Sequence, residues 1–93
     1  MLTLDHRLRP LPDAVDTELD KNEMVLLHLE TKTYYTLNST GLRIWQGLKQ
    51  GLSLRDISRC LQNEFDVDAE SADRSVLELV KDLADQRLVE AVE

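Results

Sequence analysis

An aromatic strand passes directly into a capped helix in the stretch Tyr34-Tyr35-Thr36-Leu37-Asn38-Ser39-Thr40-Gly41-Leu42-Arg43-Ile44-Trp45. The helix should begin at Asn38 or Ser39, because a short polar side chain there accepts hydrogen bonds from the free backbone N–H groups of the first turn. Trp45, the only tryptophan, shares a helix face with leucines and is expected in the core, where it contributes a large apolar surface. The stretch therefore predicts a strand and a helix that pack on one core.

Two more strands precede the aromatic one. Residues 14–19 alternate apolar and polar side chains, which is typical of a strand with one face in solvent. Residues 23–30 are apolar on both parities, as in the central strand of a sheet. A short connection leads to residues 33–37, which should return antiparallel as the third strand of a meander. Residues 1–13 contain both prolines and are expected to form an irregular lead-in.

Three helices should follow the sheet. The first ends at Gly51, and the hydroxyl of Ser53 can cap the second. The third begins between Asp68 and Ser71. Its apolar residues recur at helical spacing and are expected to be buried: Ala72, Val76, Leu79, Val80 and Leu83. The sequence thus predicts an α+β fold close to a winged helix-turn-helix, with a three-stranded antiparallel meander followed by three helices in one domain over residues 14–92.

The overall charge excludes some classes of partner. The chain carries 18 acidic and 11 basic residues, a formal net charge of −7. Such a charge repels the phosphates of nucleic acid and anionic membrane surfaces, so neither is an expected partner. No apolar run approaches the roughly 20 residues that cross a bilayer, and the N-terminus lacks a secretion signal. A cytoplasmic protein is expected.

No residue pattern suggests catalysis or a cofactor. The two histidines, His6 and His28, have no neighbour at metal-ligand spacing. Cys60 continues an apolar stripe on the second helix and is expected to be a small buried residue. The sequence shows no nucleophile–base pattern and no phosphate-binding glycine loop. We therefore expect no metal, no cofactor and no catalytic residue, and hence no enzyme.

The third strand should leave one edge of the sheet open. Apart from Lys32 at its start, residues 33–37 carry no charge, bulge or proline that would discourage pairing with another chain. An open edge can capture an extended peptide as an added strand. Ordinary strand propensity explains Tyr34 and Tyr35 equally well.

A ridge on the third helix lies beside its buried face. Arg74, Leu77 and Lys81 are spaced by three and four residues and so share one side of the helix. They fit a solvated flank, yet in a protein of net charge −7 paired cations along an apolar groove can also receive carboxylates of a bound peptide. The ridge is therefore a candidate part of a peptide site.

Short motifs occur in a defined order along the chain: Val25-Leu26-Leu27, Tyr34-Tyr35-Thr36-Leu37-Asn38, Gly41, Ile44-Trp45, Gly51, Leu54, Ile57, Leu61 and Phe65. This order resembles the PqqD family and covers roughly residues 10–90. Members of that family are compact winged-helix modules, also called peptide chaperones. They bind the leader of a ribosomally made precursor peptide and present it to a modifying enzyme or leader peptidase.

The resemblance also implies a site. In that family the leader adds to the third strand and rests against the third helix, which implicates Thr33, Tyr34, Tyr35, Thr36, Leu37, Arg74, Leu77 and Lys81. Residues 28–31 differ from the turn that is typical of members from pyrroloquinoline quinone synthesis. The aromatic pairs are more similar to stand-alone modules of lasso-peptide pathways. The expected partners are a precursor leader and a modifying enzyme, cyclase or leader peptidase.

The leading interpretation is a non-catalytic adaptor that recognises a precursor leader. Two alternatives belong to other classes. A winged-helix DNA-binding regulator would need a basic recognition helix, but the second helix carries only Arg55 and Arg59. A structural subunit of an enzyme complex would expose a large apolar patch and would bind the enzyme without any peptide.

Overall fold

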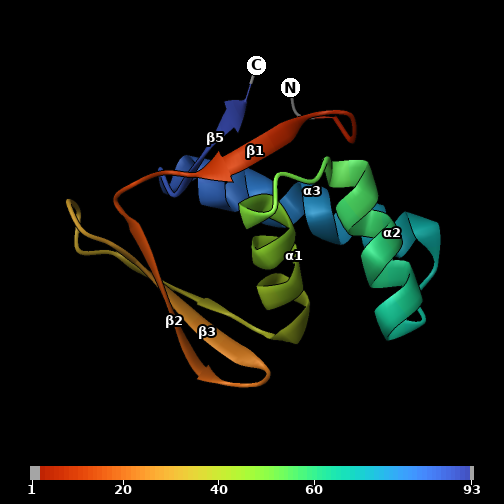
Figure 1. Cartoon of the computed structure of the whole chain (residues 1–93), viewed down its shortest axis with the longest axis horizontal. Helices are drawn as coiled ribbons and strands as arrows, with labels where there is room; N and C mark the ends of the chain where they lie inside the picture. Colours follow the sequence, from red (N-terminus) through yellow and green to blue (C-terminus); the bar gives the residue numbers. More distant parts are fainter. Residues whose placement is uncertain (1–2, 93) are drawn as a thin grey trace.

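The computed structural model describes residues 3–92, which form two small sheets and three helices. The elements in chain order are β1 (Arg7–Pro10), β2 (Ala14–Asp20), β3 (Glu23–His28), β4 (Tyr34–Leu37), α1 (Ser39–Lys49), α2 (Leu54–Phe65), α3 (Ala69–Asp85) and β5 (Val89–Val92). Figure 1 shows the β2–β3 hairpin extending to one side of α1, while β1 and β5 form a separate ribbon beside the chain ends.

The meander predicted from the sequence is confirmed. Its strands lie in the order β2-β3-β4 and pair antiparallel. In β3 the inward side chains Met24, Leu26 and His28 are buried, and Val25 and Leu27 on the other face are half-buried, as expected for a central strand. β4 pairs with β3 on one side, and no other strand within residues 3–92 pairs with its second edge. The third strand therefore lies at an edge, as predicted.

Local capping signals fix the starts of the three helices. Asn38 Oδ1 accepts from the backbone N–H of Gly41 at 2.9 Å, so Asn38 rather than Ser39 caps α1. Ser53 caps α2, and Asp68 caps α3. Gly51 follows α1 with a φ of +81°, a backbone conformation that favours glycine.

The lead-in predicted as irregular contains a strand, so that prediction is wrong for residues 7–10. Arg7–Pro10 pairs antiparallel with Val89–Val92, and Leu8 is buried in the core. The partner strand comes from the far end of the chain. Local sequence pattern carries no information on such a long-range pairing, and the two prolines obscured the strand. Residues 1 and 2 of the lead-in lie outside the described residues.

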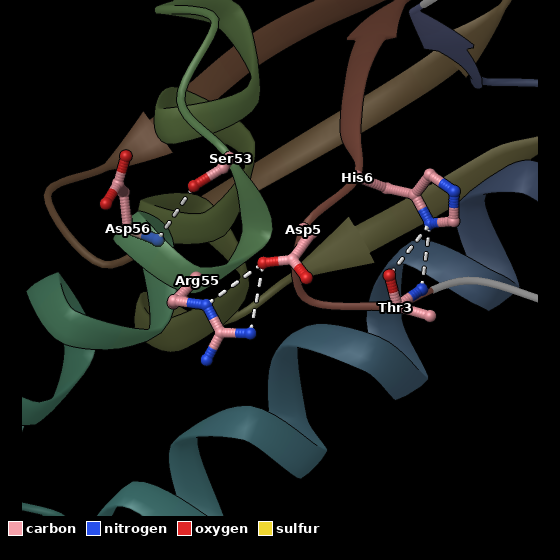
Figure 2. Close-up of polar contacts among 6 residues, drawn as sticks. All are labelled: Thr3, Asp5, His6, Ser53, Arg55 and Asp56. Atoms are coloured by element: carbon pink, nitrogen blue, oxygen red, sulfur yellow. Dashed lines mark hydrogen bonds and ion pairs between the residues drawn. The ribbon is translucent and has the colours of Figure 1, made fainter.

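The segment before β1 is attached to the first turn of α2 (Figure 2). The Arg55 guanidinium donates to Asp5 Oδ1 at 3.1 and 3.2 Å, and the Arg55 backbone N–H donates to the Leu4 carbonyl at 2.8 Å. His6 Nδ1 accepts from the backbone N–H of Thr3 at 2.8 Å. The Arg55 contacts join the N-terminal segment to the helical part of the domain, and the Thr3–His6 bond folds the segment on itself.

One core lies between the meander and the helices. Trp45 is buried, as predicted, with 1% of its surface exposed. The other apolar residues of the core are Leu8, Met24, Leu26, Leu37, Leu42, Ile44, Leu48, Leu54, Ile57, Leu61, Ala72, Val76, Val80, Leu83, Leu88 and Val89. No helix within residues 3–92 is long and apolar enough to cross a membrane.

Two burial predictions need correction. Cys60 is exposed, because the buried face of α2 is centred on Leu54, Ile57 and Leu61, and Cys60 falls on the flank of that stripe. Leu79 is half-buried rather than fully buried, because it lies at the margin of the buried face of α3. Leu79 therefore remains available to a surface groove.

Candidate functional site

A groove of about 690 Å³ lies between β4, the start of α1 and α3. Its lining combines the start of β3, most of β4, the cap and first turns of α1, and one side of α3: Glu23, Tyr35, Thr36, Leu37, Asn38, Thr40, Gly41, Ile44, Ser75, Glu78, Leu79 and Asp82. The groove runs beside the open edge of the sheet. An extended chain added to β4 would therefore lie between the sheet and α3.

The base of the groove is apolar. Leu37 and Ile44 have only 2% and 1% of their surface exposed, so they form its base. Leu79 adds a half-buried side chain from α3. Gly41 leaves space there, because a Cβ at this position would lie 3.1 Å from Leu37 Cδ2. Such a base can receive an apolar side chain of a ligand.

A hydrogen bond across the groove links β4 to α3. The Tyr35 hydroxyl donates to Asp82 Oδ2 at 3.3 Å. Partial burial, together with the negative charge of Asp82 and the hydrogen bond to it, raises the pKa of Tyr35 above its ordinary value. Tyr35 therefore stays neutral at physiological pH, and its hydroxyl links the two walls of the groove.

The free edge of β4 presents backbone groups of two residues. His28 N donates to the Thr33 carbonyl at 3.0 Å, which fixes the phase of the hydrogen bonds between β3 and β4. Hydrogen-bonded and non-hydrogen-bonded pairs alternate in an antiparallel ladder. Tyr35 therefore directs its N–H and C=O toward β3, whereas Tyr34 and Thr36 direct theirs outward. An added strand would pair with Tyr34 and Thr36.

The structure brings only part of the sequence-predicted site together. Tyr35, Thr36 and Leu37 line the groove, and Thr33 directly precedes β4. Tyr34, the remaining predicted site residue on β4, is 71% exposed and points to the outer face of the sheet.

The three predicted residues on α3 lie on another side of the helix. Arg74 forms an exposed ion pair with Glu70 at 3.3 Å, Lys81 is exposed, and Leu77 packs half-buried against the core. None of Arg74, Leu77 and Lys81 lines the groove. Their contact with a peptide stays a prediction.

Sequence reasoning missed the residues of α3 that do line the groove. Ser75, Glu78, Leu79 and Asp82 follow an i, i+3, i+4, i+7 spacing and so form one helix side. The sequence signal for this side of α3 is Leu79, an apolar residue at the margin of the buried stripe. Which margin faces β4 depends on how α3 packs on the rest of the domain, and this is a long-range property.

Within residues 3–92, no group of three or more His, Cys, Asp or Glu side chains is placed to hold a metal ion. The groove itself offers hydrogen bonding along a strand edge, an apolar base and charged rim residues. This combination is typical of domains that accept an extended peptide as an added strand.

Comparisons with known proteins agree with this class. The family model described as Coenzyme PQQ synthesis protein D (PqqD) matches residues 23–89, and the chain belongs to the PqqD family. Comparison of the sequence with curated proteins gives no match.

Two solved structures are similar over most of their length. One, TbiB1 in complex with the TbiA(beta) leader peptide, has 33% sequence identity and a TM-score of 0.81, covering 88% of this chain and 94% of that chain. The other, lasso peptide synthetase B1 complexed with the leader peptide, has 30% identity and a TM-score of 0.81, covering 90% of this chain and 98% of that chain. The fold expected from the family resemblance is confirmed.

Proposed function

We propose that this protein is a non-catalytic adaptor that binds the leader of a ribosomally synthesised precursor peptide by strand addition to β4. The observation that carries the proposal is the open edge of β4 beside a groove with an apolar base. Two similar solved structures of proteins bound to a leader peptide support it. In this role the adaptor presents the leader to a modifying enzyme, cyclase or leader peptidase, in a pathway of the lasso-peptide kind.

Binding by strand addition divides affinity and selectivity between two sets of groups. Backbone hydrogen bonds from Tyr34 and Thr36 give affinity that does not depend on the leader sequence. Alternate leader side chains face the groove and give selectivity. Ordering a flexible leader costs about 2–5 kcal/mol, so a net affinity near micromolar, about −8 kcal/mol, is expected.

The backbone geometry provides a direct test. Thr36→Pro removes one outward N–H without removing a hydrogen bond to β3, since proline is tolerated at a strand edge. The loss of one hydrogen bond, together with the bulk of the ring, should weaken leader binding at least about fivefold. The measurement is fluorescence anisotropy with a labelled leader of a precursor peptide, which would be sought in the neighbouring reading frames.

Thr36→Val is the matched control, because it changes the same side chain and keeps the N–H. It should bind like the parent. If Thr36→Pro remains folded in a thermal melt and binds with unchanged affinity, strand addition to β4 is wrong.

A second pair of variants tests which side of α3 the leader touches. Leu79 lines the groove, whereas Leu77 lies with Arg74 and Lys81 on the sequence-predicted ridge, and both leucines are half-buried. Removing a partly buried leucine contact costs about 1–2 kcal/mol, or roughly five- to thirtyfold in affinity. We expect this loss for Leu79→Ala and a smaller one for Leu77→Ala. The opposite order would move the leader to the ridge.

A further inference from the structure

The rim of the groove is acidic. Glu23 from β3 and Glu78 and Asp82 from α3 line it, and no Lys, Arg or His within residues 3–92 does so. Glu78 and Asp82 are one helical turn apart and so lie on the same side of α3. None of the three carboxylates forms an ion pair within the described residues. The rim therefore carries negative charge without a directly paired cation, beside an apolar base.

The negative charge at the rim acts on a peptide bound in the groove. The Asp82 carboxylate lies 3.3 Å from the Tyr35 hydroxyl, and both residues line the groove, so its charge is close to any group bound there. A carboxylate of a bound peptide would be repelled there, whereas a Lys or Arg would relieve the repulsion among the rim residues. Arg74 and Lys81, which would favour an acidic peptide, do not line the groove.

The geometry of an added strand predicts how basic and apolar residues are spaced in the bound leader. Alternate residues of an added strand face the same way and lie about 7 Å apart. We propose that the leader bound at β4 carries a Lys or Arg two residues from an apolar residue, with the apolar side chain on Leu37, Ile44 and Leu79 and the cation at the rim. This inference rests on the proposed function, because it assumes that a peptide adds to β4.

The test uses a displayed library of random twelve-residue peptides, selected in parallel against the parent protein and against Thr36→Pro. Peptides that the parent enriches and Thr36→Pro does not are those bound by strand addition. We expect a basic–x–apolar or apolar–x–basic pattern in them. Individual peptides with this pattern should lose at least about tenfold in affinity when Glu replaces the basic residue.

Charge-reversal variants separate the rim from the overall charge. Glu78→Lys alters the rim, whereas Glu18→Lys alters an exposed residue of β2, at the opposite edge of the sheet, with the same change in net charge. The basic preference should be lost in Glu78→Lys and kept in Glu18→Lys. Thermal melts confirm that each variant is folded.

The outcomes distinguish the two proposals. Strand-dependent peptides without a basic preference, or an equal effect of both charge reversals, overturn the inference and leave the proposed function standing. If the library yields no peptide that depends on the Thr36 N–H, the proposed function fails and the inference fails with it.

Discussion

Asp16 on β2 accepts hydrogen bonds from Trp45 Nε1 and Lys49 Nζ, both at 2.7 Å. The buried indole thereby finds the acceptor that its N–H needs. The alternation of residues 14–19 correctly predicts a strand. It does not predict which face of the strand is buried. Val15 and Leu19 are 39% and 59% exposed, while Asp16 turns toward α1. An ion pair and a tryptophan partner override the hydrophobic pattern at this residue.

The bonds of Asp16 make a prediction about stability. Asp16→Ala leaves the Trp45 N–H without its acceptor and removes the ion pair with Lys49, so the free energy of unfolding at pH 7 should fall by about 1–3 kcal/mol. Asp16→Asn, which keeps an oxygen acceptor without the charge, should lose less. Urea unfolding measures both, and equal stability of Asp16→Ala and the parent would contradict the prediction.

The same residue sets a pH dependence. The hydrogen bonds from Lys49 and then Trp45 hold the pKa of Asp16 below its ordinary value of 3.8. Because the folded-state pKa is lowered, the stabilisation is fully present above 3.8 and is lost as the pH falls through the folded pKa. The stability difference between the parent and Asp16→Asn should therefore shrink below pH 3.8, as followed by urea unfolding at a series of pH values.

At the scale of elements, the helix boundaries were predictable because their signals are local. Asn38, Ser53 and Gly51 each act on the backbone within one turn. The contacts between helices are not encoded in this way. Gly47 packs against Ile57 of α2, and a Cβ added at Gly47 would lie 2.7 Å from Ile57 Cγ1. The glycine therefore permits the close approach of α1 and α2.

Gly47→Ala tests this approach. Alanine gains about 1 kcal/mol of helix propensity over glycine, whereas forcing a methyl group into a packed contact costs about 1–3 kcal/mol. We expect a net loss in the free energy of unfolding of about 1 kcal/mol. Asn63→Ala, at an exposed position of α2, is the control and should not destabilise the protein. A Gly47→Ala variant that is more stable than the parent would show that α2 shifts freely.

For the whole molecule, the order of strands and helices and the open edge of β4 could be predicted from the sequence, because both follow from alternation and from short connections. Two features could not. The rotation of α3, which selects Leu79 instead of Leu77 for the groove, depends on packing with distant elements. The ribbon of β1 and β5 joins the two ends of the chain. Both depend on contacts between residues far apart in sequence.

The ribbon leads to a prediction about the whole domain. Leu8 on β1 has 1% of its surface exposed and belongs to the same core as the helices. Leu8→Ala should lower the free energy of unfolding by about 2–4 kcal/mol, as expected for a buried leucine. A domain of this size has a total of about 5–14 kcal/mol, so the loss is a large fraction of its stability. Neighbouring Arg9 forms an exposed ion pair with Glu90, and Arg9→Ala should cost about 1 kcal/mol or less.

Urea unfolding of the two variants, combined with amide hydrogen exchange across Val89–Val92, shows whether the β1–β5 ribbon unfolds together with the core or independently of it. If β1 belongs to the cooperative unit, Leu8→Ala lowers the protection of β5 and of the core helices together. Leader binding, measured where the variant is still folded, should not change, because the groove contains no residue of β1 or β5. Unchanged stability of Leu8→Ala would mean that the β1–β5 ribbon folds separately from the core. The strand β1 would then contribute little to the stability of the domain.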